Sequence, residues 1–177
     1  MNIFIGSSSS DNLEEKYYTS CEKLLNQIFK EENNLVFGAS NTRLMGLSYK
    51  IAKKNNKKVI GICPKIYKDD FSKLNCDKEI ITNTVNERTT ELINQSDILI
   101  FLPGGIGTIY ELLSAIESKR SHEHNKPIII YNLDNYFDKF LSTLDKIYKE
   151  KFTSQKVKDS YVICNKEEEV LKYINIK

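Results

Sequence analysis

The chain has 177 residues, a net charge of +2 at pH 7, 28% charged residues and 40% hydrophobic residues. These are ordinary values for a globular protein of this size, so we expect residues 1–177 to form one domain with a sizeable core. The small net charge argues against nucleic acid or an anionic membrane as a partner. No apolar run is long enough to span a membrane and the first residues match a strand rather than a signal peptide, so we expect a cytoplasmic protein.

Cysteine and histidine usage gives no sign of a metal centre. The cysteines occur singly and form no CxxC pair, which indicates free thiols in a reducing compartment; they are Cys21, Cys63, Cys76 and Cys164. The only histidines, His122 and His124, lie in the polar run 119–126. Their spacing could hold a metal weakly, but a solvated loop is the commoner outcome, so we expect no metal site.

Apolar runs alternate with helical periodicity along the whole chain. Strands are predicted at 2–5, 34–37, 58–62, 78–82, 98–102, 127–131 and 161–164. Helices are predicted at about 13–28, 44–54, 85–95, from 106, 136–148 and from 167, and the polar stretch 65–77 is predicted to be an exposed loop. This alternation predicts an α/β, Rossmann-like three-layer fold, whose parallel sheet has about six or seven strands covered on both faces.

The strongest functional signal is the glycine-rich turn that follows the strand at 98–102. Pro103 ends the strand, and Gly104, Gly105 and Gly107 predict a sharp turn that can approach a ligand closely. The helix that follows would present free N–H groups and the positive end of its dipole, which suits a phosphate.

The same turn argues against two common nucleotide motifs. Tyr110 stands where a dinucleotide fingerprint needs its third glycine, and no lysine follows Gly107 as a Walker loop requires. A mononucleotide or sugar phosphate therefore fits better than NAD or a nucleoside triphosphate.

A second polar loop, Ser7 to Ser10, follows the first strand. These serines could cap the next helix or hold a phosphate or ribose, and both interpretations remain open. Ligands of such folds lie beyond the carboxyl ends of the strands, so this loop and the glycine turn are the predicted walls of one crevice.

The stretch 103–111 matches PGGxGTxxE and resembles the LOG family, the cytokinin-activating nucleoside 5′-monophosphate phosphoribohydrolases often labelled lysine decarboxylases. Other segments follow in the family's order: Gly6-Ser7-Ser8-Ser9, Leu44-Met45-Gly46, Val59-Ile60-Gly61-Ile62-Cys63-Pro64, Glu87-Arg88 and Lys126-Pro127. Two departures are expected to affect the substrate side of the pocket and the base selected. Residues 38–43 stand where the family usually has VYGGG and a further glycine, and Thr89 replaces its usual lysine.

The resemblance implies hydrolysis of the N-glycosidic bond of a nucleoside 5′-monophosphate, AMP or N6-modified AMP, to free base and ribose 5-phosphate. It implies no cofactor, and nothing in the chain resembles a pyridoxal-phosphate lysine site. The implied phosphate-binding residues are Gly104, Gly105, Ile106, Gly107 and Thr108, assisted by Ser7 and Ser8. Glu111 would be the general base or oxocarbenium stabiliser and Arg88 would orient the substrate. Further candidate substrate contacts are Arg43, Met45 and Asp70.

Each candidate also has a purely structural interpretation. Thr108-x-x-Glu111 matches a capping box, and Arg88 could be a surface arginine paired with Glu91. Two other functions are open: a non-catalytic nucleotide-binding sensor or carrier of the same fold, favoured by the altered stretch 38–43, and an interaction protein whose glycine turn is only structural. The resemblance further implies a homodimer.

Overall fold

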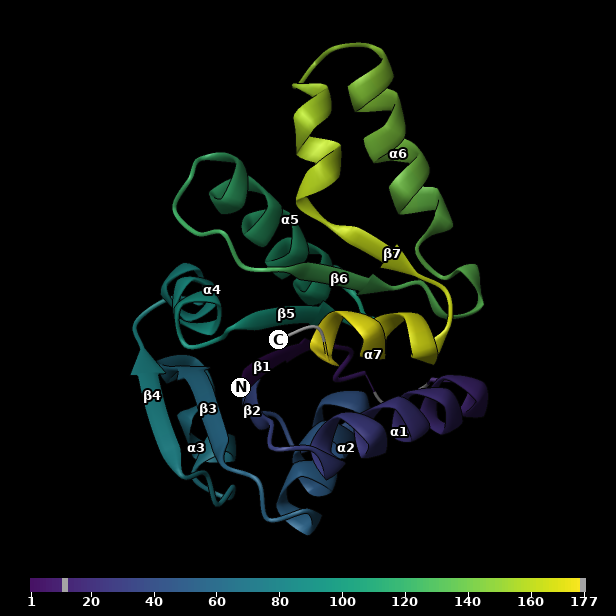
Figure 1. Cartoon of the computed structure of the whole chain (residues 1–177). Helices are drawn as coiled ribbons and strands as arrows, with labels where there is room; N and C mark the ends of the chain where they lie inside the picture. The colour runs from purple at the N-terminus through teal and green to yellow at the C-terminus, as the bar shows by residue number, and fades with distance from the viewer. Residues whose placement is uncertain (11–12, 176–177) are drawn as a thin grey trace.

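The computed structural model describes residues 1–10 and 13–175, without the side chains of Asp70, Gln155 and Asn175. Seven parallel strands form one sheet in the order β4-β3-β2-β1-β5-β6-β7 (Figure 1). Their bounds are β1 Asn2–Gly6, β2 Asn34–Phe37, β3 Val59–Pro64, β4 Lys78–Thr82, β5 Ile98–Phe101, β6 Ile128–Tyr131 and β7 Val162–Cys164. The chain builds one half of the sheet outward from β1 and then returns to β5, so the strand order reverses between these two strands.

Helices cover both faces of this sheet (Figure 1). The α-helices are α1 Glu15–Lys30, α2 Arg43–Lys54, α3 Lys68–Phe71, α4 Val85–Asn94, α5 Ile106–Arg120, α6 Asp138–Lys149 and α7 Glu167–Asn175; three 3-10 turns are η1 Lys65–Tyr67, η2 Leu133–Asn135 and η3 Gln155–Ser160. A hydrophobic core lies on each face of the sheet, and successive side chains of β1 point into one core and then the other, because side chains alternate along a strand. Ile3 packs with α1, α2 and α7, whereas Phe4 packs with α4, α5 and α6.

The predicted strands and the longer helices are confirmed, and so is the Rossmann-like α/β fold. The prediction of an exposed loop at 65–77 is wrong. This stretch contains η1 and α3, and it buries Phe71 and Leu74. The reason lies in the neighbouring strand: a Cβ on Gly61 would stand 2.6 Å from the ring of Phe71, so the glycine makes room for the ring. In the described part of the chain, no helix is both long and apolar enough to cross a membrane.

Candidate functional site

The loops that follow β1 and β5 meet the first turn of α2 at the carboxyl edge of the sheet. The Ser8 N–H donates to the Pro103 carbonyl (3.2 Å), and the Met45 N–H donates to the Ser8 carbonyl (3.1 Å). They border a cavity of about 280 Å³, at the lower end of the size range of small-molecule sites. Its lining brings together most of the predicted residues: Ser7, Ser8, Ser9, Ser10, Met45, Arg88, Gly105, Ile106, Gly107, Thr108 and Glu111.

Helix α5 begins at one wall of this cavity. Its N-cap is Gly105, whose lack of a side chain leaves the first turn without a side-chain cap. The first N–H groups of a helix have no acceptor within the helix, and they share its positive dipole end. An anion in the cavity would therefore face unsatisfied donors from residues 106–108.

The glycines of this turn matter because they lack a Cβ atom and so leave room for neighbouring groups, not because their backbone conformation is unusual. None of the seven glycines, all in the described part of the chain, has a positive φ, so none occupies the left-handed conformation that glycine adopts more easily than other residues. A Cβ on Gly104 would stand 2.1 Å from Thr108 Oγ1, whereas a Cβ on Gly105 or Gly107 would meet no atom within 4 Å. Gly104 therefore allows close packing beneath the turn, and the other two leave open space beside the cavity.

Glu111 and Arg88 form a buried ion pair in this cavity. Arg88 Nη2 donates to Glu111 Oε1 at 2.7 Å, and the two side chains are only 14% and 5% exposed. Burial raises the pKa of Glu111 to about 7, although the positive charge of Arg88 acts in the opposite direction. A carboxyl group with this pKa can gain or lose a proton near neutrality, as a general base must. Arg88 Nε is buried without a partner among the described atoms, which leaves a donor beside the cavity.

Both structural interpretations of this pair are wrong. Gly105, not Thr108, is the N-cap of α5, so Thr108 and Glu111 do not form a capping box. Arg88 is not a surface residue and pairs with Glu111; the carboxylate of Glu91 instead accepts from Gln95 Nε2. Helix α4 fixes the position of Arg88, since its own N-cap Thr84 accepts from the Glu87 N–H.

The serine loop lies opposite this pair. Ser7 is buried, and its Oγ has no hydrogen-bond partner among the described atoms, while Ser8 Oγ accepts from the Ser10 N–H (3.0 Å). Helix α1 begins only at Glu15, with N-cap Glu14 and no side-chain cap, so the serines do not cap it. Buried hydroxyls normally find a partner, which makes Ser7 Oγ a candidate ligand contact.

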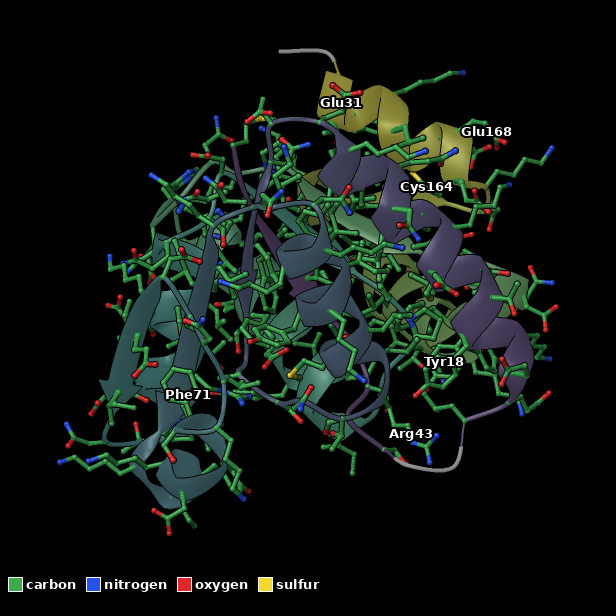
Figure 2. The ribbon with its side chains drawn as sticks, turned by 90° about the horizontal axis from the view of Figure 1, so that it is seen from below. Tyr18, Glu31, Arg43, Phe71, Cys164 and Glu168 are labelled. Atoms are coloured by element: carbon green, nitrogen blue, oxygen red, sulfur yellow. The ribbon has the colours of Figure 1, made fainter. Side chains whose placement is uncertain are left out.

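The structure separates the other predicted contacts. Met45 lines the cavity, but Arg43 is exposed, has a positive φ of 48° and lines a different cavity with Tyr18 and Lys50 (Figure 2). The side chain of Asp70 lies outside the described residues. Thr89 is buried and lines a cavity of about 350 Å³ between α4 and α5. Thr89 therefore does not line the cavity that contains Glu111.

Gly38 is a site residue that the sequence did not reveal. A Cβ there would stand 3.3 Å from Arg88 Nη1 and 3.5 Å from Met45 Cε, so the glycine leaves room for the arginine. No local pattern could have shown this, because the contact joins the end of β2 to α4.

The two histidines lie just after the C-terminal end of α5. His122 follows α5 in a left-handed conformation, with φ 62°, and His124 Nδ1 accepts from the Lys126 N–H. Within residues 1–10 and 13–175, no group of three or more His, Cys, Asp or Glu side chains could hold a metal ion.

The fold is that of a Rossmann-like α/β protein, in which a helix N-terminus and a buried titratable carboxyl group border a small cavity at the strand-order reversal. A family model described as "Possible lysine decarboxylase" matches residues 45–174. The cytokinin riboside 5′-monophosphate phosphoribohydrolase LOG2 of Arabidopsis thaliana is 32% identical over 153 residues, 86% of this chain and 71% of that protein. The probable enzyme of the same name LOGL6 of Oryza sativa subsp. japonica is 31% identical over 178 residues, 96% of this chain and 67% of that protein. The chain belongs to the LOG family, whose curated relatives are named as phosphoribohydrolases.

Solved structures support the fold. The molybdenum cofactor binding protein of Rippkaea orientalis superimposes with a TM-score of 0.71 at 21% identity, and the molybdenum cofactor carrier protein of Chlamydomonas reinhardtii with 0.67 at 18%. Each match covers 98% of this chain and 94% of the other. At these identities the likeness shows a shared fold alone.

Proposed function

We propose that this protein hydrolyses the N-glycosidic bond of a nucleoside 5′-monophosphate, AMP or N6-modified AMP, and releases free base and ribose 5-phosphate. The observation that carries the proposal is the position of the Arg88–Glu111 pair in the cavity where α5 begins. The membership of the LOG family, with relatives named as phosphoribohydrolases, supports the same reaction.

The substrate phosphate binds at the first turn of α5, where the N–H groups and the helix dipole favour an anion. Ser7 Oγ offers one further polar contact from the opposite loop. Glu111 lies five residues beyond Ile106, roughly 7.5 Å along the helix axis, which is the length scale of one ribose 5-phosphate. The phosphate site therefore fixes the sugar carbon C1′ near the carboxylate, and this positioning supplies part of the rate enhancement.

In the reaction, water adds to C1′ as the bond from C1′ to the base nitrogen breaks, and the base leaves with the bonding electrons. Ionised Glu111 stabilises the oxocarbenium-like charge and accepts a proton from the attacking water. The departing base takes a proton from solvent. Arg88 holds the carboxylate in place, and its free Nε–H contacts the ribose or the leaving group.

The decisive experiment is incubation with a panel of 5′-monophosphates, with chromatography for free base. Glu111→Gln is expected to lower the rate at least about 100-fold, the usual loss on removal of a general base, while AMP binding is retained. Glu117→Gln is the matched control, because Glu117 lies on the same helix but is exposed and pairs with Arg120. Wild-type hydrolysis by Glu111→Gln would contradict the role given to Glu111.

The second candidate function is a carrier or sensor that binds a phosphorylated ligand without cleaving it. It is favoured by the altered loop after β2, where Ala39 has a φ of 58° in place of a family glycine, and by structural neighbours that are named as cofactor carriers. Such a protein would bind AMP and release no base from any monophosphate in the panel.

We also propose a homodimer, as the family resemblance implies. Helix α5 places Ile106, 90% exposed, and Leu113, 41% exposed, on one face, which a second copy could cover. Light scattering is expected to give twice the chain mass for the wild type and a lower mass for Leu113→Lys. A monomeric wild type would exclude the dimer without affecting the proposed chemistry.

A further inference from the structure

We infer that Tyr136 is a positioning residue that fixes the orientation of the phosphate-binding turn. Its hydroxyl donates a hydrogen bond to the Gly104 carbonyl at 2.8 Å, which joins the segment after β6 to the turn after β5. The effect expected on a ligand rests on the proposed function, whereas the effect expected on the turn itself does not.

The hydrogen bond from Tyr136 fixes the peptide group between Gly104 and Gly105, at the edge of the cavity. The Gly104 carbonyl and the Gly105 N–H belong to one planar trans peptide, so they point in opposite directions. Gly105 lines the cavity, and the described residues that line it do not include Tyr136. Tyr136 therefore holds the carbonyl away from the cavity. A reversed peptide would present a carbonyl oxygen to the phosphate and lose a donor.

The turn that presents Tyr136 is held by hydrogen bonds. Asp134 and Asn135, directly before it, have φ values of 52° and 58°, the left-handed region that Asp and Asn tolerate better than other non-glycine residues but seldom occupy in succession. Buried Asn132 makes these hydrogen bonds. Its Oδ1 accepts from the Phe137 N–H (2.8 Å), and its Nδ2 donates to Asp138 Oδ1 (2.9 Å).

Aromatic contacts hold the Tyr136 ring. Tyr17 on α1 meets it edge-on with the ring centroids 5.8 Å apart, and Phe137 meets it edge-on at 5.0 Å. These contacts and the turn before it direct the Tyr136 hydroxyl at the residue before the N-cap of α5.

The test compares Tyr136→Phe with Tyr110→Phe. Each substitution removes a tyrosine hydroxyl that makes a 2.8 Å hydrogen bond. The Tyr110 hydroxyl donates to Asn86 Oδ1 beside the cavity between α4 and α5. Phenylalanine keeps the ring contacts, and circular dichroism confirms folding. Two quantities are measured: the NMR order parameters of the amides of residues 105–108 without ligand, and the dissociation constants of AMP and adenosine.

Tyr136→Phe is expected to lower the order parameters of these amides and to weaken AMP binding about fivefold, the effect of one net hydrogen bond, with adenosine binding unchanged. Tyr110→Phe should leave the order parameters and both dissociation constants unchanged. Unaltered order parameters in Tyr136→Phe, or equal weakening of AMP and adenosine, would overturn the inference. Lower order parameters in a protein whose wild type binds no 5′-monophosphate would uphold the positioning role and defeat the proposed function.

Discussion

Arg88 and Glu111 lie 23 residues apart in the chain, yet their side chains meet at 2.7 Å across the packed helices α4 and α5, almost closed to water. A buried pair contributes little net stability, because both ions lose their hydration, whereas removal of one partner leaves an uncompensated charge. The pair is therefore better explained by the cavity that it lines than by the stability of the fold.

The first prediction concerns pH. Burial raises the pKa of Glu111 to about 7, and the proposed reaction needs the ionised form, so kcat/KM for base release should fall about tenfold per pH unit below that value. The profile should be measured from about pH 5 to pH 9. The second ionisation of the substrate phosphate, near about pH 6, adds a separate lower step. A profile with no step near pH 7, which falls only with the phosphate ionisation near about pH 6, would contradict the buried environment of Glu111.

The second prediction concerns Gly38. A methyl group in Gly38→Ala would lie 3.3 Å from Arg88 Nη1, so the guanidinium must shift. Since small misplacements at a reacting centre are costly, kcat/KM should fall about tenfold or more. Stability should change little, because the glycine has no positive φ that alanine would resist. Steady-state kinetics and thermal denaturation test the two parts separately, and unchanged kinetics would show that Arg88 does not need this space.

The third prediction separates two adjacent glycines. Gly104→Ala would place Cβ 2.1 Å from Thr108 Oγ1 and should destabilise the fold by about 1–3 kcal/mol through overpacking. Gly105→Ala meets no atom within 4 Å, so the free energy of unfolding should stay within about 0.5 kcal/mol of the wild type. Its methyl group should nevertheless weaken AMP binding, because Gly105 lines the cavity. Urea unfolding and calorimetry measure the two effects, and equal destabilisation of both variants would argue against this division of roles.

The fourth prediction concerns the end of α5. His122 holds a φ of 62°, while the Glu123 N–H donates to the Ser118 carbonyl and closes the helix. Glycine adopts this conformation without a Cβ penalty, so His122→Gly should raise the free energy of unfolding by about 0.5–1 kcal/mol. His122→Ala, which keeps the penalty, is the control. A loss of stability in His122→Gly would show that the imidazole makes a contribution larger than the backbone strain.

The order of elements and the location of the glycine turn could be predicted from local sequence patterns. Strands buried on both faces must be continuously apolar and the helices between them amphipathic, so the alternation of the two periods was enough to predict the α/β fold. The stretch 103–111 likewise predicted a glycine turn before a helix, because the turn and the start of the helix both depend on residues that are neighbours in the sequence.

The contacts that these residues make became visible only in the folded chain. The spacing of Thr108 and Glu111 suited a cap as well as a catalytic carboxylate; in the fold Gly105 is the N-cap, and Glu111 pairs with Arg88, which another helix supplies. Gly38 and Gly61 matter for side chains that lie opposite them, and Tyr136 reaches Gly104 from a segment 32 residues away. Packing between distant segments has no local signature, because the space that a side chain may fill is set by whatever the fold brings against it.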